Sequence, residues 1–495
     1  MSNIRVTYSG LFAFFLSIIG IVTGLIFILI VTRSLSPEEF GTWSLIGTII
    51  GYVMISESII NFWTTREIAR GKNIGKSSLF PSIGVSFALI PIYLIISSFL
   101  SNESNALTSS MYLGLILVPV TFISQNLTAI NIGFKPENVS KSILTFEIVK
   151  IPTALFFVYF LNLGLDGTIF AIFIAFIIKL IIQLYFAIDK IKGIFEKKLV
   201  VKWFKFSWIT LYKSLPNVLA TLDVAMYTII TSSVIGIAFY AASYIIANLV
   251  KHTEKISQAL YTKLLAKGSI DHVKETFSLQ LLFGIPLVAI SVLFSKPALH
   301  ALNPIYSDAY LVVIFLAIKS LFVVLSHTFQ VVLFGIDNVD LNQKPKFSNL
   351  LHSYLFKIPS FRIIKLGIYL GILIPSLYLA FSGGMSELEL IIIWAFISLV
   401  IEIPNFSFYL IIVKQKIGFT FPHISFLKYM IGAGCLALIY FLTSPFIIIY
   451  HESIFQFLPG LILQIIICTS AYIGILYVID SKTRKLIYKI KNEVF

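Results

Sequence analysis

Positive charge is sorted along this chain with a regular period. Lys and Arg residues gather in every second gap between long apolar stretches, and 27 of the 37 lie in those gaps or in the two tails of the chain. The chain is 58% apolar and only 12% charged, which leaves too little polar surface for a soluble fold of 495 residues. The sorted charge and the long apolar stretches therefore predict a protein that crosses a membrane many times.

Fourteen apolar stretches are long enough to cross a bilayer as helices. Each has about 20 to 27 residues, and a helix of that length spans a hydrocarbon core of about 30 Å. Barrel strands are excluded because the stretches are too long and do not alternate between apolar and polar residues. The predicted fold class is an all-α polytopic membrane protein with about fourteen transmembrane helices. The predicted spans are 9–32, 41–62, 79–100, 111–132, 143–163, 167–189, 208–231, 236–260, 277–300, 309–334, 363–382, 387–412, 424–444 and 457–479.

The same asymmetry predicts the orientation of the chain in the membrane. With the N-terminus in the cytoplasm, the outward gaps hold only Arg33, and Lys296 lies near the outward end of its span. Since cytoplasmic loops carry the excess of positive residues, we expect both termini to face the cytoplasm. The net charge of +14 then belongs to loops that can lie against anionic headgroups, and it does not indicate a nucleic-acid partner. The first apolar stretch is too long for a signal-peptide core, so we expect it to remain as a helix.

Long inward gaps divide the chain into segments. The gap from Asp189 to Ser207 separates two six-helix bundles, 1–205 and 206–415, and residues 416–495 add two helices and a basic cytoplasmic tail. Six helices in each bundle give both the same orientation in the membrane, as in parallel repeats.

Glycine and proline mark specific points within the predicted spans. Gly20 and Gly24 are four residues apart, as are Gly47 and Gly51, and such spacing favours close helix packing in lipid. Pro216 lies in the helix that opens the second bundle. Because proline removes a backbone hydrogen bond and bends a helix, Pro216 is a candidate hinge.

The sequence contains no motif for nucleotide, metal or nucleophilic chemistry. The segment from Gly71 to Ser77 resembles a P-loop, but it has three residues between its glycines where a P-loop has four. Cys435 and Cys468 lie in separate spans without the spacing of a metal site. We therefore predict no catalytic residue, no metal and no bound cofactor.

Ionisable residues inside the predicted spans are the informative feature. A charge at the centre of a bilayer costs about 3 kcal/mol or more, so such groups normally face a bundle interior or a wet cavity. Nine are too many to be accidental. They are Glu57, Glu147, Lys150, Lys179, Lys213, Asp223, Lys319, His327 and Glu402.

The lysines differ in their surroundings along the chain. Lys150 is three residues after Glu147 and can pair with it on one helix. Lys213 is near the cytoplasmic end of its span and can extend to the interface. Lys179 and Lys319 are deeper and have no acidic neighbour on their own helices, which favours a wet cavity.

A cavity with unpaired lysines attracts an anion. Lys presents a compact charge that suits phosphate, so Lys179, Lys319, Lys150 and Lys213 are candidate phosphate-binding residues. Gln183, four residues after Lys179, is expected to share its face.

The deep carboxylates are candidates for ion coupling. Asp223 and Glu402 have no charged neighbour on their own helices, and Glu57 is the next candidate. A buried carboxylate can take up a proton or hold Na⁺. The alternative is a structural pair between helices with one of the lysines.

Several segments resemble one family of membrane proteins. Residues 32–45, TRSLSPEEFGTWSL, resemble the junction between the first two helices of Wzx-type polysaccharide flippases, which belong to the multidrug/oligosaccharidyl-lipid/polysaccharide exporter superfamily. Residues 64–70 look like the cytoplasmic loop that follows. Asp223, residues 238–244 and residues 303–310 look like landmarks of the second half. The family often has an Arg-lined lumen, whereas the deep basic residues here are all lysines.

The resemblance implies a mechanism and a substrate class. Two helix bundles would surround a central cavity and work by alternating access. The substrate would be a polyprenyl-phosphate or -pyrophosphate that carries an oligosaccharide, moved from the cytoplasmic to the outer leaflet of the cell (plasma or inner) membrane for surface-polysaccharide biosynthesis. The implied partners are this lipid-linked oligosaccharide, membrane lipids and other glycan-assembly proteins, with H⁺ or Na⁺ as the coupling ion and no nucleic acid.

Three alternatives remain open at this point. A drug exporter of the same superfamily would prefer cations and an acidic cavity, which the deep lysines oppose. A flippase for the peptidoglycan precursor would carry a similar phosphate-linked glycan. A membrane glycan polymerase or ligase would need a substantial external loop, whereas the outward gaps mostly have about ten residues or fewer.

Overall fold

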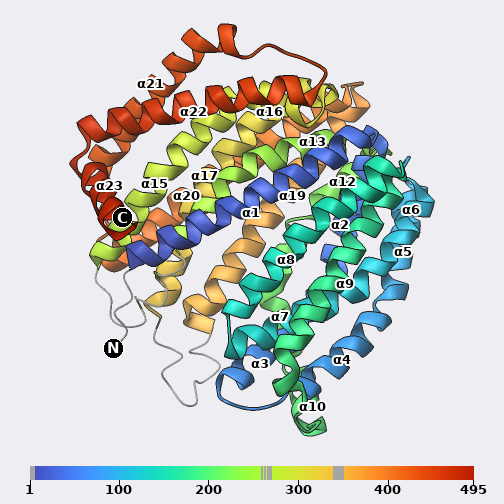
Figure 1. Ribbon diagram of the computed structural model, residues 1–495. Helices are drawn as coiled ribbons and strands as arrows, with labels where there is room; N and C mark the ends of the chain where they lie inside the picture. The colour runs from blue at the N-terminus through green and yellow to red at the C-terminus, as the bar shows by residue number, and fades with distance from the viewer. Residues whose placement is uncertain (1–5, 258–259, 261–263, 265–269, 338–350, 495) are drawn as a thin grey trace. The chain divides into compact units, whose positions relative to one another are not determined.

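The computed structural model describes residues 6–257, 260, 264, 270–337 and 351–494 of the chain (Figure 1). The described residues form helices and connecting turns, and none of them belongs to a strand. Twelve helical segments among them are long and apolar enough to cross a membrane. The all-α polytopic class predicted from the sequence is therefore confirmed, with fourteen as an approximate count of spans.

The first six predicted spans correspond to helical segments, several of them interrupted by a short turn of another helix type. They are α1 (Val6–Ser34); α2 (Pro37–Val53), η1 (Met54–Glu57) and α3 (Ser58–Ala69); α4 (Gly75–Ala88) and α5 (Ile90–Asn102); α6 (Thr108–Leu113), η2 (Gly114–Ile116) and α7 (Leu117–Phe134); α8 (Glu137–Ala154) and the π-helix η3 (Leu155–Phe160); and α9 (Gly164–Ile191).

The remaining helices follow the same order as the predicted spans. They are α10 (Lys197–Lys205), α11 (Ser207–Leu219), α12 (Leu222–Thr231), α13 (Ile235–Ala247), η4 (Asn248–Ser257), α15 (Ile270–Leu293), α16 (Ser295–Leu302), η5 (Pro304–Ala309), α17 (Tyr310–Gly335), α19 (Tyr354–Ser382), α20 (Glu387–Ile417), α21 (His423–Ile447), α22 (Ile454–Ile479) and α23 (Ser481–Val494).

The seventh predicted span, 208–231, is a correction, because it is not one continuous helix. It divides into α11, with 13 residues, and α12, with 10, each too short to cross a bilayer alone. Side chains form hydrogen bonds with backbone groups near the interruption. The Thr221 hydroxyl donates to the carbonyl of Val218 at 3.0 Å, and the Asp223 carboxylate accepts from the backbone N–H of Val224 at 2.9 Å. The chain can therefore break here without exposing unpaired backbone groups to lipid.

The chain divides by its packing into two compact units. Unit 1 comprises residues 1–19, 242–358 and 391–495, and unit 2 comprises residues 20–241 and 359–390. Helices α11 and α12 belong to unit 2, where they pack against η1, α2, α3 and α5. The three segments 1–205, 206–415 and 416–495 stay a prediction from the sequence.

The start of α2 explains part of the motif at residues 32–45. Ser36 caps the helix by accepting the backbone N–H of Glu39 at 3.2 Å, the Glu39 carboxylate accepts the N–H of Ser36 at 2.9 Å, and Pro37 occupies the first turn. This capping box fixes where the helix begins. Gly41 lies so close to the carbonyl of Val234 that a Cβ would not fit, so this position requires glycine.

The paired glycines Gly20 and Gly24 and Gly47 and Gly51 do not pack as expected. A Cβ added at any of the four meets no atom of the described residues within 4 Å. The spacing alone was an insufficient signal, because close packing also needs a neighbouring helix at that face.

The interior of unit 2 forms where α3, α7, α9 and α10 meet. Ile60 and Ile68 of α3 and Ile130 of α7 are buried in one apolar cluster. Trp203 of α10 is only 1% exposed and completes this cluster. The short basic helix α10 is thereby fastened to the membrane helices by one large side chain.

The interior of unit 1 is built largely from aromatic rings. Phe277 of α15 stacks on Phe329 of α17 at 5.1 Å between ring centroids, and Phe419, just after α20, packs edge-on against both. The Tyr472 hydroxyl of α22 donates to the carbonyl of Leu282 in α15 at 2.9 Å. These contacts join the last membrane helices of the chain to α15 and α17.

Candidate functional site

Three charged residues come together on α8 and α9 of unit 2, and we call Glu147, Lys150 and Lys179 the charge cluster. The Lys150 ammonium lies 2.5 Å from Oε2 of Glu147, so the pairing expected from their spacing is present. Thr23 of α1 donates its hydroxyl to the same oxygen at 3.0 Å. Lys150 is 8% exposed, so its charge is held inside the packed helices and is compensated by Glu147.

Aromatic rings surround both ammonium groups of the charge cluster. The Lys150 Nζ lies 5.4 Å from the ring centroid of Phe27 and 5.5 Å from that of Phe146. The Lys179 Nζ lies 5.6 Å from the Phe146 centroid and 5.4 Å from that of Phe176. The negative faces of these rings attract cations, so they help to retain positive charge in an apolar setting.

The charge cluster carries a surplus positive charge. It has two lysines and one glutamate, and Lys179 forms no ion pair with a residue that the structure describes. An ammonium held by rings keeps its hydrogen-bonding capacity for another acceptor. The arrangement is chemically suited to an anion such as phosphate.

Gln183 lies four residues after Lys179 on the continuous helix α9, but its side chain has different partners. Its side chain is buried, accepts the hydroxyl of Ser124 at 3.1 Å and donates to the hydroxyl of Thr128 at 2.7 Å, both on α7. The amide therefore ties α9 to α7, because its polar atoms find partners on that helix.

Lys213 belongs to a different group of residues in unit 2. Its Nζ lies 5.7 Å from the ring centroid of Phe62, and the guanidinium of Arg66 lies 4.6 Å from the same centroid. Two cations from α11 and α3 thus meet at one ring. No contact that the structure describes joins Lys213 to the charge cluster, so the predicted phosphate lysines do not form one site within unit 2.

Lys319 and Glu402 lie in unit 1 on helices that pack together. Phe315 of α17 contacts Phe396 of α20 at 5.5 Å between centroids, and Phe322 contacts Phe406 at 5.5 Å. These two ring contacts bracket Lys319 on α17 and Glu402 on α20. Glu402 is 3% exposed and accepts the Asn405 amide at 2.6 Å. Lys319 and Glu402 thus lie on helices that contact each other through these rings, and a structural pair between them stays a prediction from the sequence.

His327 follows on α17 and pairs with a carboxylate. Its Nδ1 lies 3.4 Å from Oε1 of Glu254 in η4, and both side chains are partly exposed. The contact is within unit 1 and joins α17 to η4.

Asp223 lies at the interruption between α11 and α12. It is 7% exposed, and its Oδ2 accepts the hydroxyl of Tyr369 in α19 at 2.7 Å. The Tyr52 hydroxyl of α2 donates to the carbonyl of Thr221 at 2.6 Å. Two tyrosines therefore hold the first turn of α12, and Asp223 is a carboxylate at a broken membrane helix, where transporter ion sites often occur.

Pro216 and Glu57 occupy other irregular points in unit 2. Pro216 lies inside α11, and the interruption comes after Leu219. Glu57 ends the 3-10 turn η1 between α2 and α3, and its Oε2 is buried without a hydrogen-bond partner among the described residues. In the described residues, no group of three His, Cys, Asp or Glu side chains could hold a metal ion.

Sequence reasoning missed the aromatic and tyrosine partners of these charges. Phe146 precedes Lys150 by one helical turn, and Phe176 precedes Lys179 by three residues, so a search for rings one turn before each lysine would have found them. Tyr52 and Tyr369 are distant from Asp223 in the sequence and gave no such signal.

Comparison with known proteins gives both a family match and a fold. The family model described as "Polysaccharide biosynthesis protein" matches residues 10–253. No curated protein matches the sequence.

The fold is shared with several solved transporters. An inward-facing multidrug resistance MATE family transporter of the MOP superfamily is similar over 79% of this chain and 94% of that chain, with a TM-score of 0.61 and 13% identity. A MATE in the straight conformation is similar over 83% and 96%, with a TM-score of 0.54 and 14% identity. A MOP superfamily transporter from Pyrococcus furiosus is similar over 84% and 96%, with a TM-score of 0.51 and 13% identity.

These identities are low, so the likeness shows the fold, which is that of the MATE transporters. The family model for polysaccharide biosynthesis proteins matches residues 10–253, just under half of the chain. The twelve long apolar helical segments of the described residues indicate a multi-pass membrane protein.

Proposed function

We propose that the chain is a translocase that moves a polyprenyl-phosphate- or pyrophosphate-linked oligosaccharide from the cytoplasmic to the outer leaflet by alternating access. The observation that carries this proposal is the charge cluster: a surplus ammonium, Lys179, held by Phe146 and Phe176 on membrane helices. The match of residues 10–253 to the polysaccharide biosynthesis family supports a glycan as the cargo.

The chemistry of the charge cluster favours an anionic cargo. A charged headgroup must exchange water for protein contacts as it crosses, and a charge-assisted hydrogen bond from Lys is among the stronger replacements. Lys150 is already balanced by Glu147, so an arriving phosphate would meet Lys179 as the available donor. On this proposal Lys213, in unit 2, and Lys319, in unit 1, stay further candidate residues for binding the phosphate.

A drug exporter for organic cations is less consistent with this arrangement. The aromatic rings could bind an organic cation, but the Phe146 ring already contacts the ammonium groups of Lys150 and Lys179. The Pyrococcus furiosus relative was described with a binding pocket of reverse polarity that suggests a different function, so polarity differs within the superfamily. A peptidoglycan-precursor flippase remains the nearest alternative, because its cargo has the same phosphate-linked chemistry.

A glycan polymerase or ligase would need a catalytic surface outside the membrane. The connections on the proposed outer face are short, for example Leu35–Ser36 between α1 and α2 and residues 448–453 between α21 and α22. Such turns leave little room for an external active site.

The proposal also includes the orientation of the chain in the membrane and the coupling of transport to an ion. The charge distribution supports cytoplasmic termini and a location in the cell membrane. Asp223, Glu402 and Glu57 are the proposed coupling residues for H⁺ or Na⁺, because binding an ion at a buried carboxylate would bias one orientation of the transporter over the other. Other glycan-assembly proteins are proposed partners.

The decisive experiment measures translocation in vesicles. The full chain is reconstituted with a fluorescent polyprenyl-pyrophosphate oligosaccharide, and the share accessible on the far leaflet is followed over time. We expect Lys179→Ala to weaken cargo binding by about 1 kcal/mol or more and to slow translocation at least fivefold. Lys179→Arg should recover part of the rate, since the charge is kept.

The matched control is Lys296→Ala, which removes an exposed lysine in α16, far from Lys179 in the sequence. It should leave the rate unchanged. Normal transport by Lys179→Ala would contradict the role of the charge cluster. Transport of organic cations without transport of the lipid-linked oligosaccharide would contradict the proposed function itself.

A further inference from the structure

The last membrane helix passes almost directly into an amphipathic helix. α22 ends at Ile479, Asp480 is the only connecting residue, and α23 begins at Ser481. Asp480 has an extended backbone, with φ −120° and ψ 107°, so the chain changes direction there. A single connecting residue spans less than about 4 Å, so the start of α23 must lie where the span leaves the hydrocarbon.

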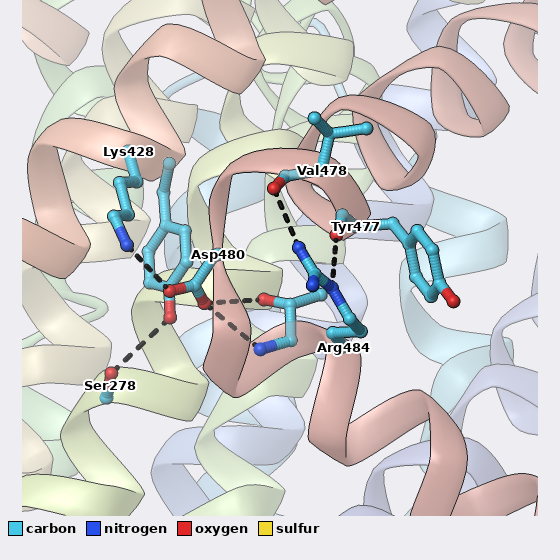
Figure 2. Close-up of polar contacts among 8 residues, drawn as sticks. Ser278, Lys428, Tyr477, Val478, Asp480 and Arg484 are labelled. Atoms are coloured by element: carbon cyan, nitrogen blue, oxygen red, sulfur yellow. Dashed lines mark hydrogen bonds and ion pairs between the residues drawn. The ribbon is translucent and has the colours of Figure 1, made fainter.

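Asp480 fastens α23 to α21. Its Oδ2 accepts the backbone N–H of Thr483 at 3.1 Å and the Thr483 hydroxyl at 2.8 Å, which caps the new helix. Its Oδ1 lies 3.3 Å from the Lys428 ammonium (Figure 2). Asp480 is 2% exposed, so this junction is inside the packed protein.

Arg484 makes a second attachment, to the end of α22. Its Nε donates to the carbonyl of Tyr477 at 3.0 Å and a terminal nitrogen donates to the carbonyl of Val478 at 2.9 Å (Figure 2). These carbonyls lie in the last turn of α22, where no intrahelical donor remains. The Tyr477 and Tyr488 hydroxyls are 3.0 Å apart. The first turns of α23 are thus held at a fixed place.

The two sides of α23 differ. Thr483 is buried and Leu486 packs against the apolar core of unit 1, whereas Lys482, Arg484 and Lys485 are exposed. The helix carries five Lys and Arg residues and one acidic residue. Its exposed side therefore presents concentrated positive charge.

We propose that Lys482, Arg484 and Lys485 of α23 form a binding site for anionic phospholipid headgroups of the cytoplasmic leaflet. The site rests on the proposed orientation of the chain, which places α23 at that leaflet. Headgroups are the occupant because the junction fixes these residues at the level where a membrane span ends, and each basic residue near an anionic surface is attracted to it. A nucleic acid or an acidic protein would have to displace the lipid already present at that depth.

The test measures which lipid gathers at α23 in the full chain. Cys435 and Cys468 are replaced by Ala, Ser481→Cys carries a fluorophore, and the protein is reconstituted in phosphatidylcholine vesicles. The vesicles contain a small share of either phosphatidylglycerol or phosphatidylcholine, each with the same nitroxide near the headgroup. The ratio of quenching by the two lipids reports the local enrichment of the anionic lipid.

We expect phosphatidylglycerol to quench several-fold more strongly than phosphatidylcholine. Lys482→Gln with Lys485→Gln should bring the ratio close to one, since each charge contributes up to about fivefold. Lys482→Arg with Lys485→Arg should keep the enrichment. Lys414→Gln with Lys416→Gln is the matched control, which removes two exposed lysines at the end of α20 and should leave the ratio unchanged.

Three results would overturn the proposal. Equal quenching by both lipids would show no selectivity, and an unchanged ratio in the Lys482→Gln, Lys485→Gln protein would place the selectivity elsewhere. Absence of quenching by either lipid would show that α23 is away from the headgroups. Translocation of the cargo is measured separately, so failure of this site and failure of the proposed function are distinguishable.

Discussion

At the scale of single residues, one aromatic ring organises the buried charge of unit 2. Phe146 lies within 5.6 Å of both lysine ammonium groups of the charge cluster, and Glu147 is the next residue in the chain. The ring and the carboxylate together allow two lysines to remain close on membrane helices. Neither residue alone would offset the cost of placing them there.

The Glu147–Lys150 pair gives the first prediction. We expect Glu147→Gln to lower the free energy of unfolding by about 2 kcal/mol, because it leaves Lys150 buried beside a neutral amide. The value is below the roughly 3 to 5 kcal/mol of a fully buried pair because the Glu147 side chain is 18% exposed. Thermal unfolding in detergent measures it. Adding Lys150→Met should restore most of the stability, and a double variant as unstable as the single one would contradict the pairing argument.

Asp223 gives a prediction about coupling. We expect Asp223→Asn to slow net transport more than it weakens cargo binding and to remove the dependence of transport on pH or Na⁺, because an amide cannot titrate. Rates across ion gradients in vesicles measure this. Tyr369→Phe is the informative companion, since it removes the hydroxyl donor and keeps the carboxylate. Full rate and full ion dependence in the Asn protein would leave Glu402 or Glu57 as the coupling residue.

Asp480 gives a prediction about pH, and it lies outside the membrane spans. Burial would raise the pKa of its carboxyl, but the hydrogen bonds from Thr483 and Lys428 outweigh burial and hold the pKa below its ordinary value of 3.8. A lowered folded-state pKa stabilises the protein above the unfolded-state pKa, and that stabilisation is lost as the pH falls through the folded-state pKa. We therefore expect Asp480→Asn to lower the unfolding temperature at pH 7 and to differ less from the native chain at about pH 2, because the stabilisation is lost only as the pH falls through a folded-state pKa that lies below 3.8. An equal difference at both pH values would contradict this assignment.

At the scale of elements, the interruption between α11 and α12 is the feature that could not be predicted from the sequence. The residues around Ala220 and Thr221 are as apolar as their neighbours, so hydropathy averaged over a span indicates one continuous helix. The break depends on hydrogen bonds from Tyr52 and Tyr369, which are distant in the sequence. Spans, orientation and the Glu147–Lys150 pair follow from local composition and spacing, whereas the partners of Asp223 follow only from packing.

Pro216 allows the hinge hypothesis to be tested at this scale. If α11 bends at Pro216 during transport, Pro216→Ala should slow translocation and leave cargo binding unchanged, because alanine restores a backbone donor and stiffens the helix. Tyr52→Phe is the comparison, since it loosens the interruption after Leu219 and keeps the proline. A normal rate with Pro216→Ala and a reduced rate with Tyr52→Phe would place the flexible point at the interruption.

At the scale of the whole molecule, orientation rests on the summed charge of many loops. We expect single cysteines at Ser36 and Ser386 to react with an impermeant maleimide added outside cells, and cysteines at Gln415 and Ser481 to react only after the membrane is opened. All four positions are exposed in the structure, so failure to react reports the side of the membrane. Reversed labelling at two of these positions would contradict the proposed topology.

The junction at Asp480 also has a practical consequence for anyone who purifies this protein. A basic tail after the final span is a natural segment to remove when a shorter chain is wanted for expression. Removal after Ile479 would leave the Lys428 ammonium without its carboxylate and the last carbonyls of α22 without the Arg484 guanidinium. The trimmed protein would lose structure at the end of α22, so a shortened version of the protein should keep Asp480 and Arg484 of the tail.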